Sequence, residues 1–202
     1  MDNIELNLAI YSSNISSTVS IFKDSAEVRE KRVEELMKKL EIESWSEEEF
    51  RKFSHYDMHF DWLLIQALFI SGFSYFENFM RNIAEIIEKD KGDKIKLNDI
   101  KGDGYLDTYR KYINLIGDIQ KANSDRKEWQ VILEFKTIRN AITHDNGIIT
   151  KKLFKIKEHD LYFGPGEKYI RIKNIKFLED FVTTSTKYME SIAQEIGQKN
   201  NK

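Results

Sequence analysis

Apolar residues recur every three or four positions along most of this chain, the spacing that gives an α-helix one buried face. The first such segment runs from about Ser16 to Leu40 and predicts a charged amphipathic helix. Between Ile4 and Ile10 apolar and polar residues alternate instead, which fits either a strand or more helix. Ser46 and the three glutamates after it predict the start of a short helix, because a serine hydroxyl caps free N–H groups and acidic side chains favour that end.

A second long helix is predicted from about Asp57 to Lys89, with Gly92 just beyond its end. Its first half contains the run WLLIQALFI, which is apolar nearly all round and is therefore expected at the centre of a bundle. Its second half is amphipathic, with an apolar side and a polar arc. The apolar side consists of Phe73, Phe76, Phe79, Met80, Ile83 and Ile87, and the polar arc of Ser74, Glu77, Asn78, Arg81, Glu85 and Glu88.

The rest of the chain predicts three more helices and one hairpin. Helices are expected from Tyr105 to Gln120 and from Arg126 to about His144, where Asp145-Asn146-Gly147 is a strong turn signal. The segment from Lys152 to Lys173 is rich in β-forming residues around a central Gly-Pro-Gly, a pattern typical of a β-hairpin. A final helix is expected from Asn174 onward.

These elements predict a mainly α fold, an antiparallel helical bundle of four to five helices with a small β-hairpin before the last helix. We expect residues 1–50 to form an N-terminal helical extension packed on the bundle, and residues 51–202 to form the helical domain that includes the hairpin. The chain has 202 residues, of which 41% are hydrophobic and 12% aromatic, enough to fill the core of a domain of this kind.

Charge and cysteine content exclude several classes of protein. A net charge of −2 is too balanced for a protein that coats nucleic acid by charge alone, and the absence of cysteine excludes disulfides, a thiolate nucleophile and a cysteine-based zinc site. No apolar run is long enough to span a bilayer and no signal peptide is recognisable, so we expect a cytoplasmic protein without membrane contact. Residues 91–202 hold 22 Lys+Arg against 16 Asp+Glu. This local excess fits an anionic partner or an ordinary solvated surface.

The candidate catalytic residues are Arg139, Asn140 and His144, which precede the tight turn. An arginine guanidinium suits phosphate oxygens, and a histidine exchanges a proton near neutral pH. Together they predict metal-independent cleavage of a phosphodiester, in which a histidine-assisted ribose 2′-OH attacks phosphorus and arginine stabilises the developing charge. In a straight helix Arg139 and His144 point about 140° apart. They converge only if the helix ends between them or a neighbour completes the site.

The Arg139-Asn140 pair, the histidine five positions after the arginine and the turn that follows resemble the motif of HEPN (higher eukaryotes and prokaryotes nucleotide-binding) domains. The similarity extends over roughly residues 55–196. It implies a bundle of four or five helices and, as in many members, a metal-independent endoribonuclease of toxin–antitoxin, CRISPR or antiviral systems. It also implies a homodimer that brings two motifs into one cleft.

The same resemblance implies a role for each site residue. Arg139 would contact the scissile phosphate, and His144 would be the acid–base group. Asn140 would orient the site or bind phosphate. Glu77, on the preceding long helix, would support Arg139 or His144.

The function expected on these grounds is an endoribonuclease that leaves a 2′,3′-cyclic phosphate and a free 5′-OH, without cofactor or metal. The expected partners are an RNA substrate, a second copy of the chain and an antitoxin or regulatory protein. Two other interpretations stay open, a non-catalytic HEPN-like module that binds a nucleotide, RNA or protein, and a helical dimerisation protein without a site. In either case Arg139 pairs with Glu77 or Glu134, His144 caps the helix, and Asn140 is a hydrogen-bonded core amide.

Two further groups of residues bear on partners and metals. Lys151, Lys152 and Lys155 alternate with apolar residues, so this strand either tracks an RNA backbone or is protected by lysines against edge-to-edge pairing. His55 and His59 have a spacing that two metal ligands can share, but no motif supplies a third ligand. We therefore expect no metal site.

Overall fold

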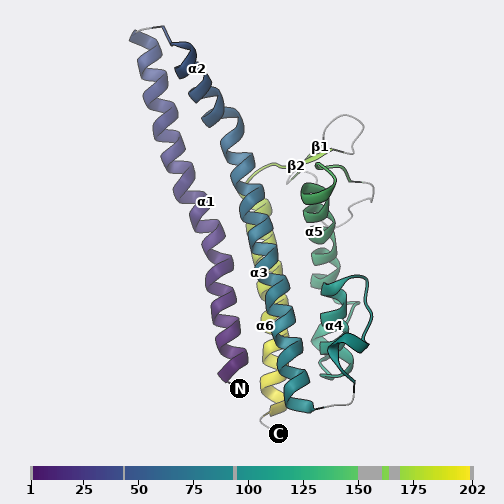
Figure 1. Ribbon diagram of the computed structural model, residues 1–202. Helices are drawn as coiled ribbons and strands as arrows, with labels where there is room; N and C mark the ends of the chain where they lie inside the picture. The colour runs from purple at the N-terminus through teal and green to yellow at the C-terminus, as the bar shows by residue number, and fades with distance from the viewer. Residues whose placement is uncertain (1, 43, 93–94, 150–160, 164–168, 201–202) are drawn as a thin grey trace.

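Figure 1 shows the computed structural model of the protein, which describes residues 2–42, 44–92, 95–149, 161–163 and 169–200. The described residues form six α-helices and one pair of strands, so the prediction of a mainly α bundle is confirmed. The helices are α1 (Asp2–Ile42), α2 (Glu47–Ser54), α3 (Phe60–Lys91), α4 (Tyr105–Leu115), α5 (Lys127–His144) and α6 (Ile175–Asn200). Shorter turns are the π-helix η1 (His55–His59) and the 3₁₀-helices η2 (Leu97–Asp99) and η3 (Gln120–Ala122).

Helix α1 begins at Asp2, so the segment left open between strand and helix is helical. Some apolar residues of α1 are buried in the bundle and others are exposed to solvent. Ile4, Tyr11 and Ile15 are buried against α3 and α6, whereas Leu6 and Ile10 are 57% and 52% exposed. The strand-like alternation therefore came from apolar residues that remain on the surface, while the buried ones follow helical spacing.

Helices α2, η1 and α3 follow one another without an intervening loop and return antiparallel to α1 (Figure 1). The predicted start of α2 is confirmed by a capping box, in which Ser46 Oγ accepts from the Glu49 backbone N–H and the Glu49 carboxylate accepts from the Ser46 N–H. Trp45 closes the turn, because its indole N–H donates to the Leu36 carbonyl at 2.9 Å. The far end of this hairpin extends beyond the other helices (Figure 1).

An aromatic cluster joins the central helices α3, α5 and α6. Phe69 on α3 lies 5.0 Å and 5.2 Å, between ring centroids, from Phe177 and Phe181 of α6. Phe135 on α5 lies 5.2 Å from each of the same two rings. The predicted apolar side of α3 is buried throughout. These contacts fix the position of α5 relative to α3 along the bundle. They thereby also fix which solvent-facing side chains of the two helices lie at the same level.

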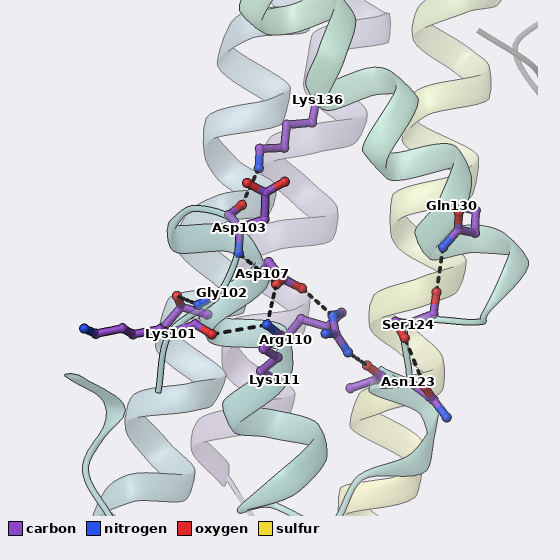
Figure 2. Close-up of polar contacts among 12 residues, drawn as sticks. Lys101, Gly102, Asp103, Asp107, Arg110, Lys111, Asn123, Ser124, Gln130 and Lys136 are labelled. Carbon is purple, nitrogen blue, oxygen red and sulfur yellow. Dashed lines mark hydrogen bonds and ion pairs between the residues drawn. The ribbon is translucent and has the colours of Figure 1, made fainter. Parts of the chain in front are cut away.

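A polar network holds α4 against α5 (Figure 2). Arg110 is only 5% exposed, and its Nε donates to Asp107 Oδ1 at 2.9 Å. Its Nη1 donates to the Ala122 carbonyl at 3.1 Å, and the guanidinium lies 5.5 Å from the ring centroid of Trp129 on α5. Burial alone would raise the pKa of Asp107, but the Asp103 backbone N–H and Arg110 outweigh it, so the pKa is lowered.

Helix α4 is shorter than predicted, ending at Leu115 rather than near Gln120. Asp118 adopts a left-handed conformation with φ of 54°, which is incompatible with a continuing helix. The chain then turns back through η3 to meet α6, where the Glu195 carboxylate accepts from the Gln120 and Lys121 backbone N–H groups. The end of α4 thus depends on a contact with a helix more than 70 positions later in the chain.

The strands β1 (Leu161–Phe163) and β2 (Ile170–Ile172) pair antiparallel, with Leu161 opposite Ile172. They form the described part of the hairpin predicted over 152–173, since residues 150–160 and 164–168 lie outside the described residues. Arg171 fixes β2 to the bundle, because its guanidinium lies 4.4 Å from the Trp62 ring centroid of α3. None of the described helices has the length and apolar content needed to cross a membrane.

Replacing Asp107 with alanine is expected to destabilise the fold by about 3 kcal/mol, because it leaves the buried Arg110 guanidinium without its counter-charge. Urea unfolding followed by circular dichroism measures this loss. The control is Glu34→Ala, which breaks the exposed ion pair with Lys38 and should leave the unfolding midpoint unchanged. Equal midpoints for wild type and Asp107→Ala would contradict the importance of the network.

Candidate functional site

The three candidate catalytic residues lie on the last two turns of α5. The helix continues without a break through His144, and its C-cap is Asp145. It therefore does not end between Arg139 and His144, which leave the helix axis about 140° apart. Of the two ways in which these side chains could converge, the helix ending is excluded by the structure, so within one chain the two side chains point in different directions.

Arg139 is brought together with both Asn140 and Glu77. Its side chain is 24% exposed, and its Nη1 donates to Asn140 Oδ1 at 3.0 Å. Its Nη2 lies 3.7 Å from Glu77 Oε2 on α3, an ion pair longer than a hydrogen bond. The Nε of Arg139 is buried and has no hydrogen-bond partner among the described residues. The predicted association of Glu77 with the arginine is thus present in the structure.

Asn140 lies between Arg139 and His144 on the surface of α5. It accepts from Arg139, and it lies four residues before His144, which places both on one helix face. His144 is exposed at the helix end, beside Thr143, whose hydroxyl donates to the Arg139 carbonyl at 2.8 Å. The arrangement presents a cation held in place by an amide and a carboxylate, with an accessible imidazole one turn further along.

The electrostatics of the site are set by Glu77, Arg139 and Lys136. Burial raises the pKa of the Glu77 carboxyl, while the nearby charges of Arg139 and Lys136 act in the opposite direction without cancelling it. Lys136 precedes Arg139 by three residues on α5, and its Nζ donates to the Asp103 carbonyl at 2.8 Å (Figure 2). This contact brings the loop before α4 to the site.

Lys136 and the Asp103 loop were not anticipated from the sequence. The lysine could have been found from its spacing, because a residue three positions before Arg139 shares its side of a helix. The loop could not, since it meets Lys136 only through a contact across 33 positions of the chain.

Other candidates lie elsewhere. Lys151, Lys152 and Lys155 lie outside the described residues. His59 Nδ1 accepts from the Trp62 indole N–H at 3.4 Å. Among the residues that the structure describes, no three His, Cys, Asp or Glu side chains are grouped as metal ligands would be.

Comparison of the chain with protein-family models, with curated proteins and with solved structures gave no match in any of the three.

The raised pKa of Glu77 predicts a specific pH dependence of stability. The folded state holds this proton to higher pH than the unfolded chain, whose carboxyl titrates near 4.5. The contribution of Glu77 to the free energy of unfolding therefore falls as the pH rises from about 4 to above the raised pKa of Glu77 in the folded state. At higher pH this contribution is constant.

Glu77→Gln removes this titration. The free energy of unfolding of wild type minus that of the variant should therefore be larger at pH 4 than at pH 7. Urea unfolding of both proteins at the two pH values measures the difference, and a carboxyl-carbon NMR titration reports the pKa directly. A wild type that gains relative to the variant on going from pH 4 to pH 7 would show that the Arg139 ion pair outweighs burial.

Proposed function

We propose that this protein is a metal-independent endoribonuclease of HEPN type, with Arg139 and His144 as its catalytic residues and Asn140 as the residue that orients them. The observation that carries the proposal is the fixed guanidinium of Arg139, held by Asn140 at 3.0 Å and by Glu77 at 3.7 Å, on the same two turns of helix as an exposed histidine. A fixed cation and an accessible imidazole are the two groups that phosphodiester cleavage through the ribose 2′-OH requires, and a second chain is needed to bring them together.

In the proposed reaction one imidazole accepts the proton of the 2′-OH, and the 2′ oxygen attacks the adjacent phosphorus. The bond from phosphorus to the 5′ oxygen breaks, the 5′ oxygen takes up a proton from water, and the imidazolium releases its proton to the solvent. The products are a 2′,3′-cyclic phosphate and a free 5′-OH. Arg139 contacts the non-bridging oxygens, on which negative charge increases in the transition state.

A homodimer is part of this proposal, because Arg139 and His144 leave one helix in different directions. A second chain would place its His144 opposite the Arg139 of the first, and a two-fold axis would form two equivalent sites. We place the enzyme in the cytoplasm, in toxin–antitoxin or antiphage defence, with an antitoxin or regulatory protein as a further partner. These settings rest on the family resemblance.

The non-catalytic interpretation draws support from the Arg139–Glu77 ion pair, since an arginine that joins α3 to α5 also stabilises a bundle. A HEPN-like module would then bind RNA, a nucleotide or a protein partner without cleaving it. Cleavage assays separate the two functions.

Purified wild type is expected to cleave RNA in excess EDTA and to leave a 2′,3′-cyclic phosphate end. Arg139→Ala and His144→Ala should each lower the cleavage rate by at least about 100-fold, since each removes a group that acts in the transition state. Gel analysis of labelled RNA, including transfer RNA, measures the rates. The control Arg32→Ala removes an exposed arginine of α1 and should cleave as wild type does.

Circular dichroism establishes that each variant is folded. Activity surviving in either site variant would mean that the motif is not the catalytic one. Absence of cleavage by wild type on every RNA tested would favour the binding module.

Mixing the two inactive variants tests whether each site is shared between chains. If Arg139 and His144 of one site come from different chains, random exchange restores about a quarter of the wild-type sites, because half of the dimers are mixed and each has one intact pair. Cleavage by the mixture after subunit exchange measures this recovery. A mixture as inactive as its components would place both residues of a site on one chain.

A further inference from the structure

Tyr105 is the most exposed large apolar side chain among the described residues, at 82%. It occupies the first position of α4, and its ring makes no ring contact or hydrogen bond with the described part of the chain. The core contacts of this helix come from its neighbours, since Leu106 is buried and Tyr109 packs against the core. The packing of α4 therefore does not require an aromatic side chain at position 105.

Hydrogen bonds hold the turn that precedes Tyr105, and Figure 2 shows the one between Asp103 and Asp107. The Gly102 N–H donates to Thr108 Oγ1 at 3.1 Å, and the Asp103 N–H donates to Asp107 Oδ2 at 2.9 Å. A Cβ atom at Gly102 would lie 2.4 Å from the Thr108 backbone nitrogen, so only glycine fits this approach. The backbone at the start of α4 is thus fixed before any ligand binds, so binding through Tyr105 does not require ordering of this backbone.

The residues that immediately precede Tyr105 lie next to Lys136 of α5. Lys136 Nζ donates to the Asp103 carbonyl, and a Cβ atom built on Gly104 would lie 3.4 Å from the same nitrogen. The lysine therefore touches the residues immediately before Tyr105. It also precedes Arg139 by one helical turn, so a single basic side chain connects the residues before Tyr105 with the arginine of the proposed site.

Tyr109 gives a second connection between the same two regions. It lies one turn after Tyr105 on α4 and faces α3. Burial raises its pKa, the Arg81 guanidinium of α3 acts against this rise, and the Glu85 and Glu77 carboxylates of the same helix add to it. Glu77 in turn pairs with Arg139.

We propose that Tyr105 stacks on an unpaired base of the RNA, while Lys136 contacts the phosphate of the strand that leads to Arg139. An exposed aromatic ring next to basic side chains is the combination that binds single strands, because every base offers a face for stacking. Bases in a duplex are already stacked on their neighbours, so the substrate class is single-stranded RNA. This role rests on the proposed function and specifies its substrate.

The test measures binding separately from cleavage. Fluorescence anisotropy with a 2′-O-methyl RNA, which lacks the 2′-OH nucleophile, gives the dissociation constant for the single strand and for its duplex. Tyr105→Ala should bind the single strand about tenfold more weakly, the effect of losing one stacked base, and Tyr105→Phe should bind as wild type does. The control Tyr75→Ala removes an exposed tyrosine on the side of α3 opposite to Glu77, two residues or about 200° away. This variant should bind the single strand as wild type does.

Cleavage of unmodified RNA in EDTA is measured on the same proteins. Equal affinity of wild type and Tyr105→Ala for the single strand, or equal affinity of wild type for single strand and duplex, would overturn the base-binding role while leaving cleavage untouched. Tyr105-dependent binding without any cleavage would support the base-binding role and overturn the catalytic proposal. A Tyr105→Ala variant with a raised KM and an unchanged kcat supports both.

Discussion

The site depends on the aromatic cluster that fixes α5 against α3 and α6. Phe135 and Phe69 contact the same two rings of α6, so α3 and α5 are held at a fixed position relative to each other. Arg139 follows Phe135 by one turn on α5, and Glu77 follows Phe69 by about two turns on α3. Because side chains lean toward the N-terminus of their helix, those of antiparallel helices lean toward each other. The Arg139–Glu77 ion pair is a polar contact between two helices that the apolar packing already joins.

The buried Arg110 adds a second constraint of a different kind. A guanidinium in the interior is tolerated only when its donors are satisfied, and here Asp107, the Ala122 carbonyl and the face of Trp129 do so. Asp107 also accepts from the Asp103 N–H, so the same carboxylate that satisfies Arg110 shapes the loop before α4. The network thereby sets where Lys136 can meet that loop. The rigid parts of the molecule are buried or hydrogen-bonded, whereas His144 and Tyr105, the groups proposed to meet RNA, are exposed.

What could be predicted from the sequence was local. The buried face of α3 and the capping box at Ser46 follow from spacing and from side chains three residues apart, and both are present. The predicted extent of α4 was wrong because its end is set by Asp118 and by contacts with α6. The Glu77–Arg139 pair followed from the polar arc of α3 and the family resemblance. Lys136 was missed although its spacing to Arg139 places it on the same side of the helix, whereas Tyr105 was missed because its relation to Lys136 comes from a contact between a loop and a helix that no periodicity encodes.

The distance between the Glu77 carboxylate and the Arg139 guanidinium determines whether the arginine can also bind a phosphate. At 3.7 Å the carboxylate offsets the charge of the guanidinium without forming a hydrogen bond, so the donor on Nη2 is not committed to it. A phosphate that takes this donor brings negative charge beside Glu77 and further disfavours its ionised form. Burial already raises the Glu77 pKa, which makes proton uptake easier than for an exposed glutamate. Anion binding at Arg139 and protonation of Glu77 are therefore linked, each favouring the other.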